Sequence, residues 1–448
     1  MSKRKSFSDK VFVSLKNKIA RLDRLKVVNH LVNDTECDFT RNRKLPFPDV
    51  IMLILSMAGC PIREELLDYF DYDINTATVS AFVQARSKIL PEAFEELFHS
   101  FNKAYPCTET YKGYRLIAVD GSDLNIPYAP EDLDTYHSNG PNAKGTNQFH
   151  INVAYDILND RYVDLIIQGK ALIYEQKAMW TMAERFLTGK TIFIADRNYP
   201  SWNNMEHIIH AEKYFLMRSK DIHSHTSILE KFDLPDSEFD LDVCVTLTPR
   251  QTNEVKSHPK KYRFLPASST FDFFDKSNPF YDVSYRAVRF KLNGGSEEYE
   301  CIITNLPRNE FSAADIKEIY RLRWQEEISF RHLKYSADLS AVHARKRSSI
   351  LQEIWARAIL YNFSFVIIRG LAKRKAKNKR KKRKFEYVSN KTRAIHLIRD
   401  LLMKRKGGSS PPDLEALISN ETLPLRPGRS DPRKVRPQSV ISFNYRFS

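Results

Sequence analysis

Residues 320–334 carry four side chains that could do chemistry, set at helical spacing. They are a phenol, an acid and two bases: Tyr320, Arg323, Glu327 and Lys334. At about 100° per residue they fall within roughly 60° of one another on a helix, and we call this surface the Glu strip. The preceding Ser312-Ala-Ala-Asp315 pattern predicts a capped helix start, and no Gly or Pro follows. Glu326 is expected to point away from the strip, so Glu327 is the candidate acid.

Two further acids favour a chemical role over an ordinary amphipathic helix with surface ion pairs, which the pattern alone would also fit. Asp120 ends the apolar run that begins at Arg115, and Asp196 ends the one that begins at Thr191. Three carboxylates without clustered thiols or histidines suit hard cations such as Mg²⁺. Two such ions can activate a water molecule or a hydroxyl group and stabilise the leaving oxygen in phosphodiester cleavage.

The overall charge points to a polyanionic partner. The chain has 448 residues and a formal net charge of +16, which favours nucleic acid first and an acidic membrane surface second. The five cysteines form no C-x-x-C motif, so neither a disulfide framework nor a zinc site is expected. No apolar run approaches the ~20 residues of a membrane span. The N-terminus lacks a signal-peptide pattern, so we expect a cytoplasmic protein.

The order of apolar patterns predicts an α/β fold with a mixed sheet and flanking helices. Residues 148–156 and 161–168 are expected to form a hairpin around Asn159-Asp160. Residues 1–105 are expected to be helical, and a short helix over 78–88 would display Gln84, Arg86 and Lys88 toward DNA. A helical scaffold with a solvated face explains that N-terminal pattern equally well.

The composition divides the chain into five expected parts. They are a helical N-terminal DNA-binding domain (1–105), the first part of a catalytic core (106–219), a β-rich insertion (220–305), the second part of the core with the Glu helix (306–371), and a basic, Pro/Arg-rich C-terminal tail (372–448). Within the tail, the run of bases at 373–384 repels itself and is expected to be disordered until it meets phosphate. Residues 424–448 are expected to extend over the surface.

These residues together resemble the bacterial DDE transposases of the insertion-sequence-four family. The spacing of the Glu strip matches that family's Y-R-E-K signature. Asp120 in Val-Asp-Gly-Ser and Asp196 in Ala-Asp-Arg-Asn-Tyr are similar to its first and second catalytic aspartates. The resemblance covers roughly residues 47–371 and extends to the Arg-Pro-Gly-Arg sequence of the tail. Asn198 stands where the family commonly has Gly, and Asn tolerates the left-handed backbone conformation.

The resemblance implies a ribonuclease H-like core, interrupted by the β-rich insertion before the Glu helix. It implies that Asp120, Asp196 and Glu327 are catalytic and hold metal, two Mg²⁺ ions for which Mn²⁺ can substitute. The implied DNA-binding residues are Tyr320, Arg323 and Lys334. We also expect Arg197, directly after the second aspartate, to contact DNA. Family members act through DNA hairpins at the transposon ends, and their insertion supplies an aromatic side chain for an unstacked base. The candidates here are Phe273, Phe274 and Trp324.

We therefore expect a nucleoid-associated bacterial transposase that binds double-stranded DNA at the terminal inverted repeats, cleaves there and joins the ends to target DNA. By analogy with the family it acts as a homodimer on DNA and needs no membrane. Two alternatives stay open. One is a domesticated DNA-binding protein without turnover, and the other is a ribonuclease H-like nuclease that performs no strand transfer.

The basic run generates a first prediction. Removing residues 373–384 should flatten the salt dependence of non-specific DNA binding, because each phosphate that the run no longer neutralises reduces the log–log slope by about 0.9. Preference for the element's end sequence should remain. Binding isotherms at several salt concentrations measure the slope, and an unchanged slope would show that the run does not bind DNA.

Overall fold

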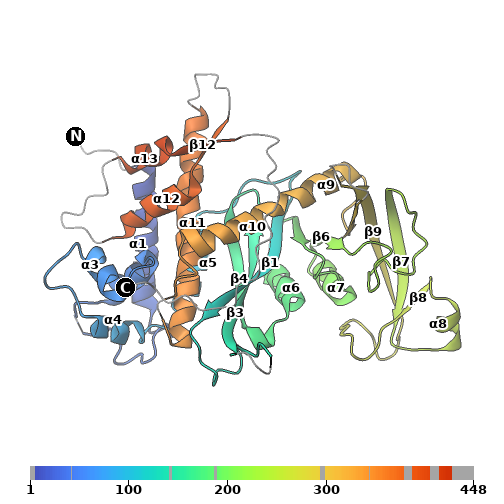
Figure 1. Cartoon of the computed structure of the whole chain (residues 1–448), viewed down its shortest axis with the longest axis horizontal. Helices are drawn as coiled ribbons and strands as arrows, with labels where there is room; N and C mark the ends of the chain where they lie inside the picture. Colours follow the sequence, from blue (N-terminus) through green and yellow to red (C-terminus); the bar gives the residue numbers. More distant parts are fainter. Residues whose placement is uncertain are drawn as a thin grey trace. The chain divides into compact units, whose positions relative to one another are not determined.

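The computed structural model describes residues 6–41, 43–140, 144–185, 189–292, 298–342, 344–377, 386–403 and 413–425. The chain folds into two compact units, and neither is a single stretch of sequence (Figure 1). The helical unit comprises residues 1–106, 123–149 and 328–448, and the sheet unit comprises residues 107–122 and 150–327. The five-part division expected from composition stays a prediction.

The helical unit gathers its helices on one long helix, α11 (Arg347–Lys377). Among the described residues, the helices that contact it most extensively are α1, α2, α5, α12 and α13. The predicted helical character of residues 1–105 is confirmed by α1 (Phe7–Leu25), α2 (Phe47–Ser56), α3 (Ile62–Tyr69), α4 (Val79–Arg86) and α5 (Glu92–Ala104). The unit also contains β2 (Tyr136–His137), η2 (His332–Ser336), β11 (Tyr387–Ser389), α12 (Lys391–Arg399), η3 (Asp400–Leu402), α13 (Leu414–Asn420) and β12 (Thr422–Pro424).

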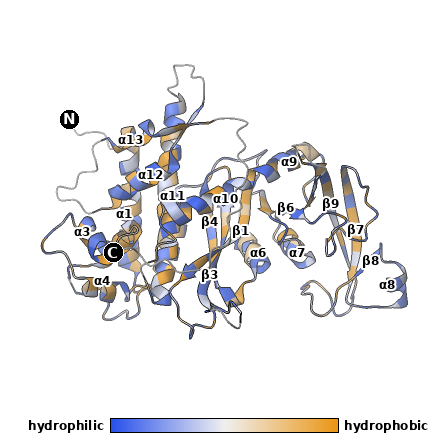
Figure 2. Cartoon of the chain, in the orientation of Figure 1, coloured by the Kyte–Doolittle hydropathy of each residue, from blue (hydrophilic) through white to orange (hydrophobic). Residues whose placement is uncertain are grey.

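Helix α11 is apolar because it is the centre of this unit. Apolar residues recur along it (Figure 2). Residues 347–375 are long and apolar enough to cross a membrane, but 89% of the apolar window is buried inside the protein. Its C-terminal turns include residues 373–377, so the start of the basic run is helical rather than disordered. Residues 378–384 and the expected extended tail from 426 onward lie outside the described residues.

A ten-stranded mixed sheet runs in the order β2-β3-β1-β5-β6-β10-β9-β7-β8, with β4 also paired to β3. All of its strands except β2 lie wholly or mostly in the sheet unit. The strands are β1 (Arg115–Ile126), β3 (Thr146–Asp156), β4 (Arg161–Gly169), β5 (Thr191–Ala195), β6 (Tyr214–Ser219), β7 (Phe239–Thr248), β8 (Tyr262–Phe264), β9 (Tyr281–Lys291) and β10 (Tyr299–Thr304). The helical elements are η1 (Lys170–Leu172), α6 (Glu175–Arg185), α7 (Trp202–His210), α8 (Asn253–Ser257), α9 (Ala313–Leu322) and α10 (Trp324–Arg331), whose last residues belong to the helical unit. The predicted hairpin is confirmed as β3 and β4.

The β-rich insertion continues the same sheet rather than forming a separate one. Strand β10 pairs antiparallel with β6, and β9 pairs antiparallel with both β10 and β7. The hydrophobic core is correspondingly continuous. Its buried members come from β1 and β5, from α6 and α7, and from the insertion: Ile117, Val119, Phe193, Met179, Met205, Val243 and Tyr285 among them.

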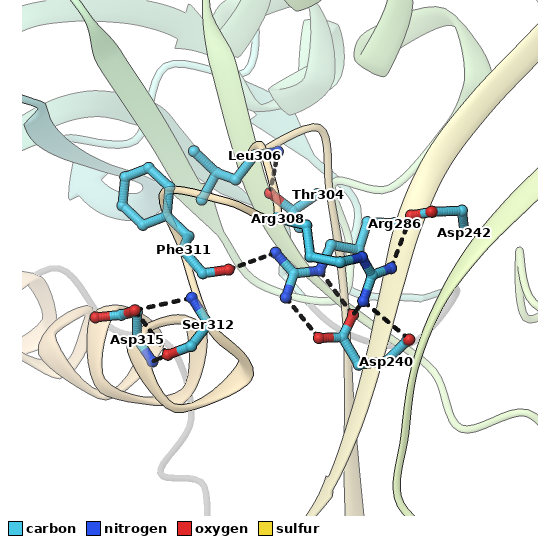
Figure 3. Close-up of polar contacts among 9 residues, drawn as sticks. All are labelled: Asp240, Asp242, Arg286, Thr304, Leu306, Arg308, Phe311, Ser312 and Asp315. Carbon is cyan, nitrogen blue, oxygen red and sulfur yellow. Dashed lines mark hydrogen bonds and ion pairs between the residues drawn. The ribbon is translucent and has the colours of Figure 1, made fainter.

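A buried arginine ties the insertion to the segment that leads into α9 (Figure 3). Arg286 on β9 donates to both carboxylate oxygens of Asp240, at 2.7 and 2.6 Å, and to the carbonyl oxygen of Phe311 at 2.7 Å. Arg308 adds an ion pair of 2.6 Å to the same Asp240. The next residue, Ser312, caps α9 in the predicted capping box with Asp315. The start of α9 is therefore fixed to the insertion by charge-assisted hydrogen bonds.

Arg286→Ala tests this anchor. The Arg286 side chain is 3% exposed, so its loss leaves the Asp240 carboxylate and the Phe311 carbonyl without a buried partner. The free energy of unfolding should fall by about 3 kcal/mol, measured by urea denaturation. Arg308→Ala is the matched control. That side chain is 44% exposed, so its loss should cost less than about 1 kcal/mol. Equal effects would contradict the assigned role of Arg286.

Candidate active site

Strands β1 and β5 bring the two aspartates level with each other. They pair in parallel, with Arg115 opposite Thr191 and Ala118 opposite Ile194. The same register, carried two residues further, sets Asp120 beside Asp196. Asp196 follows the end of β5 as predicted, whereas β1 continues past Asp120 to Ile126. Asp120 therefore lies inside β1. The apolar run before it ends where the strand becomes less buried, not where the strand itself ends.

Local backbone donors orient both aspartates. Asp120 Oδ1 accepts from the Gly121 N–H at 2.9 Å, and Asp196 Oδ1 accepts from the Arg197 N–H at 2.6 Å. Burial raises the pKa of Asp120, which the Gly121 N–H and the charge of Arg323 partly offset. Asn198 is not among the described residues with positive φ, so the turn after Asp196 does not use the left-handed conformation.

The Glu helix is not one regular helix. Helix α9 ends at Leu322, α10 begins at Trp324, and residues 332–336 form a π-helical turn. Between the two helices the N–H of Arg323 donates to Tyr320 O at 3.0 Å, and the N–H of Glu326 donates to Arg323 O at 2.9 Å. These are bonds over three residues, typical of the tighter 3₁₀ turn, in which each residue advances about 120°.

This tightening corrects the expected direction of Glu326. At about 120° per residue, positions three apart eclipse, so Tyr320, Arg323 and Glu326 come into line. Glu326 is fully buried at 0% exposure, and its carboxyl group lies close enough to Asp120 for the two to interact electrostatically. Burial and the Asp120 charge raise the pKa of Glu326 well above its usual range. The prediction that Glu326 points away is wrong.

Glu327 takes a different position, paired with Arg323. Arg323 Nη2 lies 3.0 Å from Glu327 Oε1, and the Glu327 side chain is 35% exposed. Arg323 itself is 8% exposed. Burial alone would lower its pKa, but the neighbouring Tyr320, Asp196 and Glu327 outweigh burial and raise it. Arg323 is thus a permanent cation whose charge acts on Asp120, Asp196, Glu326 and Glu327.

Three residues near these acids were not identified from the sequence: Tyr199, Glu175 and His150. The Tyr199 hydroxyl is buried, and the carboxyl groups whose charges act on it are Glu175, Asp120, Glu326 and Asp196; we call these four the acid cluster. Glu175 begins α6 and lies 3.0 Å from His150 Nε2. A Cβ at Gly121 would lie 2.1 Å from the same nitrogen. In the sequence, the sign of this close packing was Gly121, which directly follows Asp120.

Some of the predicted DNA-binding residues are exposed, and others are buried or paired with other groups of the protein. Helix α4 does not display Arg86, and that expectation is wrong: the side chain is 3% exposed and binds Glu353 at 2.8 Å and Gln352 at 2.9 Å on α11. Gln84 is exposed, while Lys88 forms a 2.7 Å ion pair with Asp38. Lys334 is partly buried and donates to the carbonyl oxygen of Asp123 at 2.9 Å. Burial lowers its pKa.

A cavity of about 660 Å³ opens beside Asp196 in the sheet unit. Three bases contribute to its lining, Arg197, Lys220 and Arg263, together with several hydroxyl groups and the rings of Tyr174 and Trp202. Among the aromatic candidates, Trp324 is 50% exposed. Phe273 is stacked on His210 at 4.4 Å, and Phe274 packs against the core. Trp324 is therefore the one of the three with a ring face available.

The site chemistry suits a divalent cation by residue type. Its donors are carboxylate oxygens, the ligands that Mg²⁺ and Mn²⁺ prefer. No group of three or more His, Cys, Asp or Glu side chains within the described part of the chain is gathered closely enough to hold an ion.

Comparison with known proteins decides the family. Residues 111–363 match the family model described as a transposase DDE domain. The chain belongs to the transposase DDE-domain family. The match contains both strand aspartates and the whole Glu strip.

Relatives within this family are similar over short stretches. The transposase for insertion sequence element IS421 of Escherichia coli is 42% identical over 45 residues, which are 10% of this chain and 12% of that protein. InsL of insertion sequence element IS186A of Escherichia coli has the same identity and coverage. The chain thus matches about an eighth of the length of these relatives. The cryo-EM structure of the piggyBac transposase synaptic complex with hairpin DNA aligns with a TM-score of 0.41 and 11% identity, over 93% of this chain and 84% of that one.

The close approach at Gly121 gives a prediction for this DDE domain. In Gly121→Ala the new methyl group collides with the His150 ring, which is 5% exposed and cannot swing into solvent. Urea denaturation should show a loss of about 1–3 kcal/mol in the free energy of unfolding. At Gly59 nothing lies within 4 Å of a Cβ, so Gly59→Ala should change stability by no more than about 1 kcal/mol. Adding His150→Ala should recover part of the Gly121→Ala loss, and no recovery would contradict the clash.

Proposed function

We propose that this chain is a transposase of the insertion-sequence-four group, with a ribonuclease H-like core. It binds the terminal inverted repeats of its element, cleaves there and joins the ends to target DNA. Membership of the DDE-domain family supports the reaction class. The single observation that carries the site assignment is the β1–β5 register that sets Asp120 level with Asp196. Arg323, the ion-pair partner of Glu327, interacts electrostatically with both aspartates.

Asp120, Asp196 and Glu327 would hold the divalent ions, two Mg²⁺ with Mn²⁺ as a substitute. Bound there, the ions supply activation of a water or hydroxyl nucleophile and stabilisation of the leaving oxygen. The chain's own residues orient the acids: the Gly121 and Arg197 N–H groups fix one oxygen of each aspartate. Arg323 keeps Glu327 in place by their 3.0 Å ion pair. The carboxylate groups of the three acids would have to move closer together when the ions bind.

The DNA-binding proposal rests on the bases near these acids. For Tyr320 and Arg323 the support is that the buried Tyr320 hydroxyl and Arg323 Nε have no hydrogen-bond partner among the described residues, so a phosphate would satisfy both if binding of the end DNA uncovers them. Arg197 is exposed and lines the cavity beside Asp196. That cavity could receive an unstacked nucleotide at a hairpin end, with the bases holding its phosphate and the rings of Tyr174 and Trp202 facing its base. Trp324 offers a second stacking face. Two copies of the chain would hold the two ends together.

Substitution of Glu327 tests the proposal. Glu327→Gln keeps the shape and removes the charge that would hold a cation, so Mg²⁺-dependent cleavage of end duplex should fall by orders of magnitude. Gel-shift affinity for the same duplex should survive or tighten, because one negative charge leaves a site that faces phosphate. The control is Glu318→Gln, on the exposed surface of α9, which should cleave at the wild-type rate.

The variant Glu326→Gln distinguishes the role of Glu326 from that of Glu327. Burial and the Asp120 charge raise the pKa of Glu326 and so favour its neutral form. A neutral amide at this position should therefore change the charge less than Glu327→Gln does, and cleavage should fall less. If Glu326→Gln is the more damaging variant, the assignment moves to Glu326. Absence of cleavage by the wild-type protein on verified ends would favour the non-catalytic DNA-binding protein. Cleavage without joining to target DNA would favour the simple nuclease.

A further inference from the structure

One wall of the cavity beside Asp196 is made by a segment of the insertion, residues 268–274, which we call the strap. Its first three residues, Ser268, Ser269 and Thr270, line the cavity and each carries a hydroxyl group. Every residue of the strap is described, and all seven lie between β8 and β9, outside any helix or strand. The position of this wall therefore depends on side-chain contacts rather than on a helix or a sheet.

Asp272 fastens the strap to α7 through a reciprocal pair with Asn203. Asn203 Nδ2 donates to Asp272 Oδ2 at 2.9 Å, and the N–H of Asp272 donates to Asn203 Oδ1 at 2.9 Å. The same Asp272 Oδ2 lies 2.8 Å from Nε2 of His207, which is one turn further along α7. Asn203 is buried and itself lines the cavity. The strap is thus joined by hydrogen bonds to a second residue of the same cavity.

Aromatic packing holds the strap against the same helix. The ring of Phe273 is stacked on His210 with 4.4 Å between centroids, and it lies 4.8 Å from the ring of His207. His207 is in turn stacked on Trp180 of α6 at 4.3 Å. These rings set how far the strap lies from α7, while Asp272 sets which part of its backbone faces Asn203.

The strap adds hydroxyl groups to a cavity that already holds bases. Arg197, Lys220 and Arg263 line the same space of about 660 Å³, a size typical of sites for small molecules. Hydroxyl groups beside cations are donors suited to the phosphate and sugar oxygens of a nucleotide. A nucleotide that is paired and stacked in a duplex cannot enter such a space, whereas an unpaired one can leave the stack and do so.

We propose that Asp272 is a positioning residue: by its bonds to Asn203 and His207 it sets the strap as the wall of a site for an unpaired nucleotide, and so gives the protein a preference for hairpin ends over blunt ends. This rests on the function proposed above for the cavity. Without the anchor the strap backbone separates from α7, and its hydroxyl groups leave the three bases. Contacts to the phosphates of paired DNA do not depend on it.

Hydrogen exchange in the DNA-free full chain tests the anchor. Peptides that cover residues 268–274 should exchange about fivefold faster in Asp272→Ala, because two hydrogen bonds at the low end of the usual range stabilise by about that factor. The low end applies because the Asp272 side chain is 48% exposed. Asp275→Ala is the matched control, since Asp275 accepts from the Ser277 N–H at 3.0 Å within its own loop. Equal exchange in the two variants would overturn the anchor.

Exchanging the two partners separates this pair from a general loss of packing. Asn203→Asp sets a second carboxylate beside Asp272, and the repulsion should speed exchange of the strap. Adding Asp272→Asn restores one amide and one carboxylate, so the double variant should return toward the wild-type rate. A double variant that exchanges as fast as Asn203→Asp alone would contradict the reciprocal pair.

DNA binding gives the functional readout. Gel shifts in chelator compare a duplex closed by a hairpin loop of unpaired nucleotides with a blunt duplex of the same sequence. Wild type and Asp275→Ala should prefer the hairpin, and Asp272→Ala should lose about fivefold of that preference with its affinity for the blunt duplex unchanged. A preference retained in Asp272→Ala would refute the positioning role alone. A wild type without preference would count against the nucleotide-binding role proposed for the cavity, and the exchange rates would still decide whether Asp272 holds the strap.

Discussion

Mutual repulsion of carboxylates is the constraint on which the candidate active site of this DDE domain depends. Parallel pairing of β1 with β5 sets Asp120 level with Asp196, and Glu326 is buried against the first of them. The protein offsets this repulsion in two ways. Burial raises the pKa of Glu326, which favours its neutral form, and the always-charged guanidinium of Arg323 interacts with these acids. The anchor at Arg286 and the cap at Ser312 hold the α9 segment from which Arg323 extends.

Much of the fold and part of the site followed from local signals. The capping box at Ser312, the hairpin around Asn159-Asp160 and the apolar strand before Asp196 are encoded within a few residues each. Such signals survive in any tertiary context, because they depend on backbone hydrogen bonds and on side-chain alternation. The two strand aspartates could be found for the same reason.

The directions of individual side chains could not be found in this way. An ideal helix sends Glu326 outward, and only two hydrogen bonds over three residues turn it toward Asp120. Arg86 looked like a surface base on a short helix until α11, far along the chain, supplied Glu353 as its partner. Tyr199, His150 and Glu175 come from separate elements, and a single sequence carries no signal that they meet. Each miss is a case of tertiary contacts overriding local periodicity.

The interleaving of the two units has a consequence for how the chain is made. Helices α1, α2 and α5 leave the ribosome early, yet the helix that they all contact, α11, begins only at Arg347. The buried bond from Arg86 to Glu353 likewise spans 267 residues. The sheet unit is complete once Glu327 has been synthesised, so during translation it can finish folding while the N-terminal helices still expose their apolar faces. A chaperone that covers those apolar faces would be needed most in the interval before α11 leaves the ribosome.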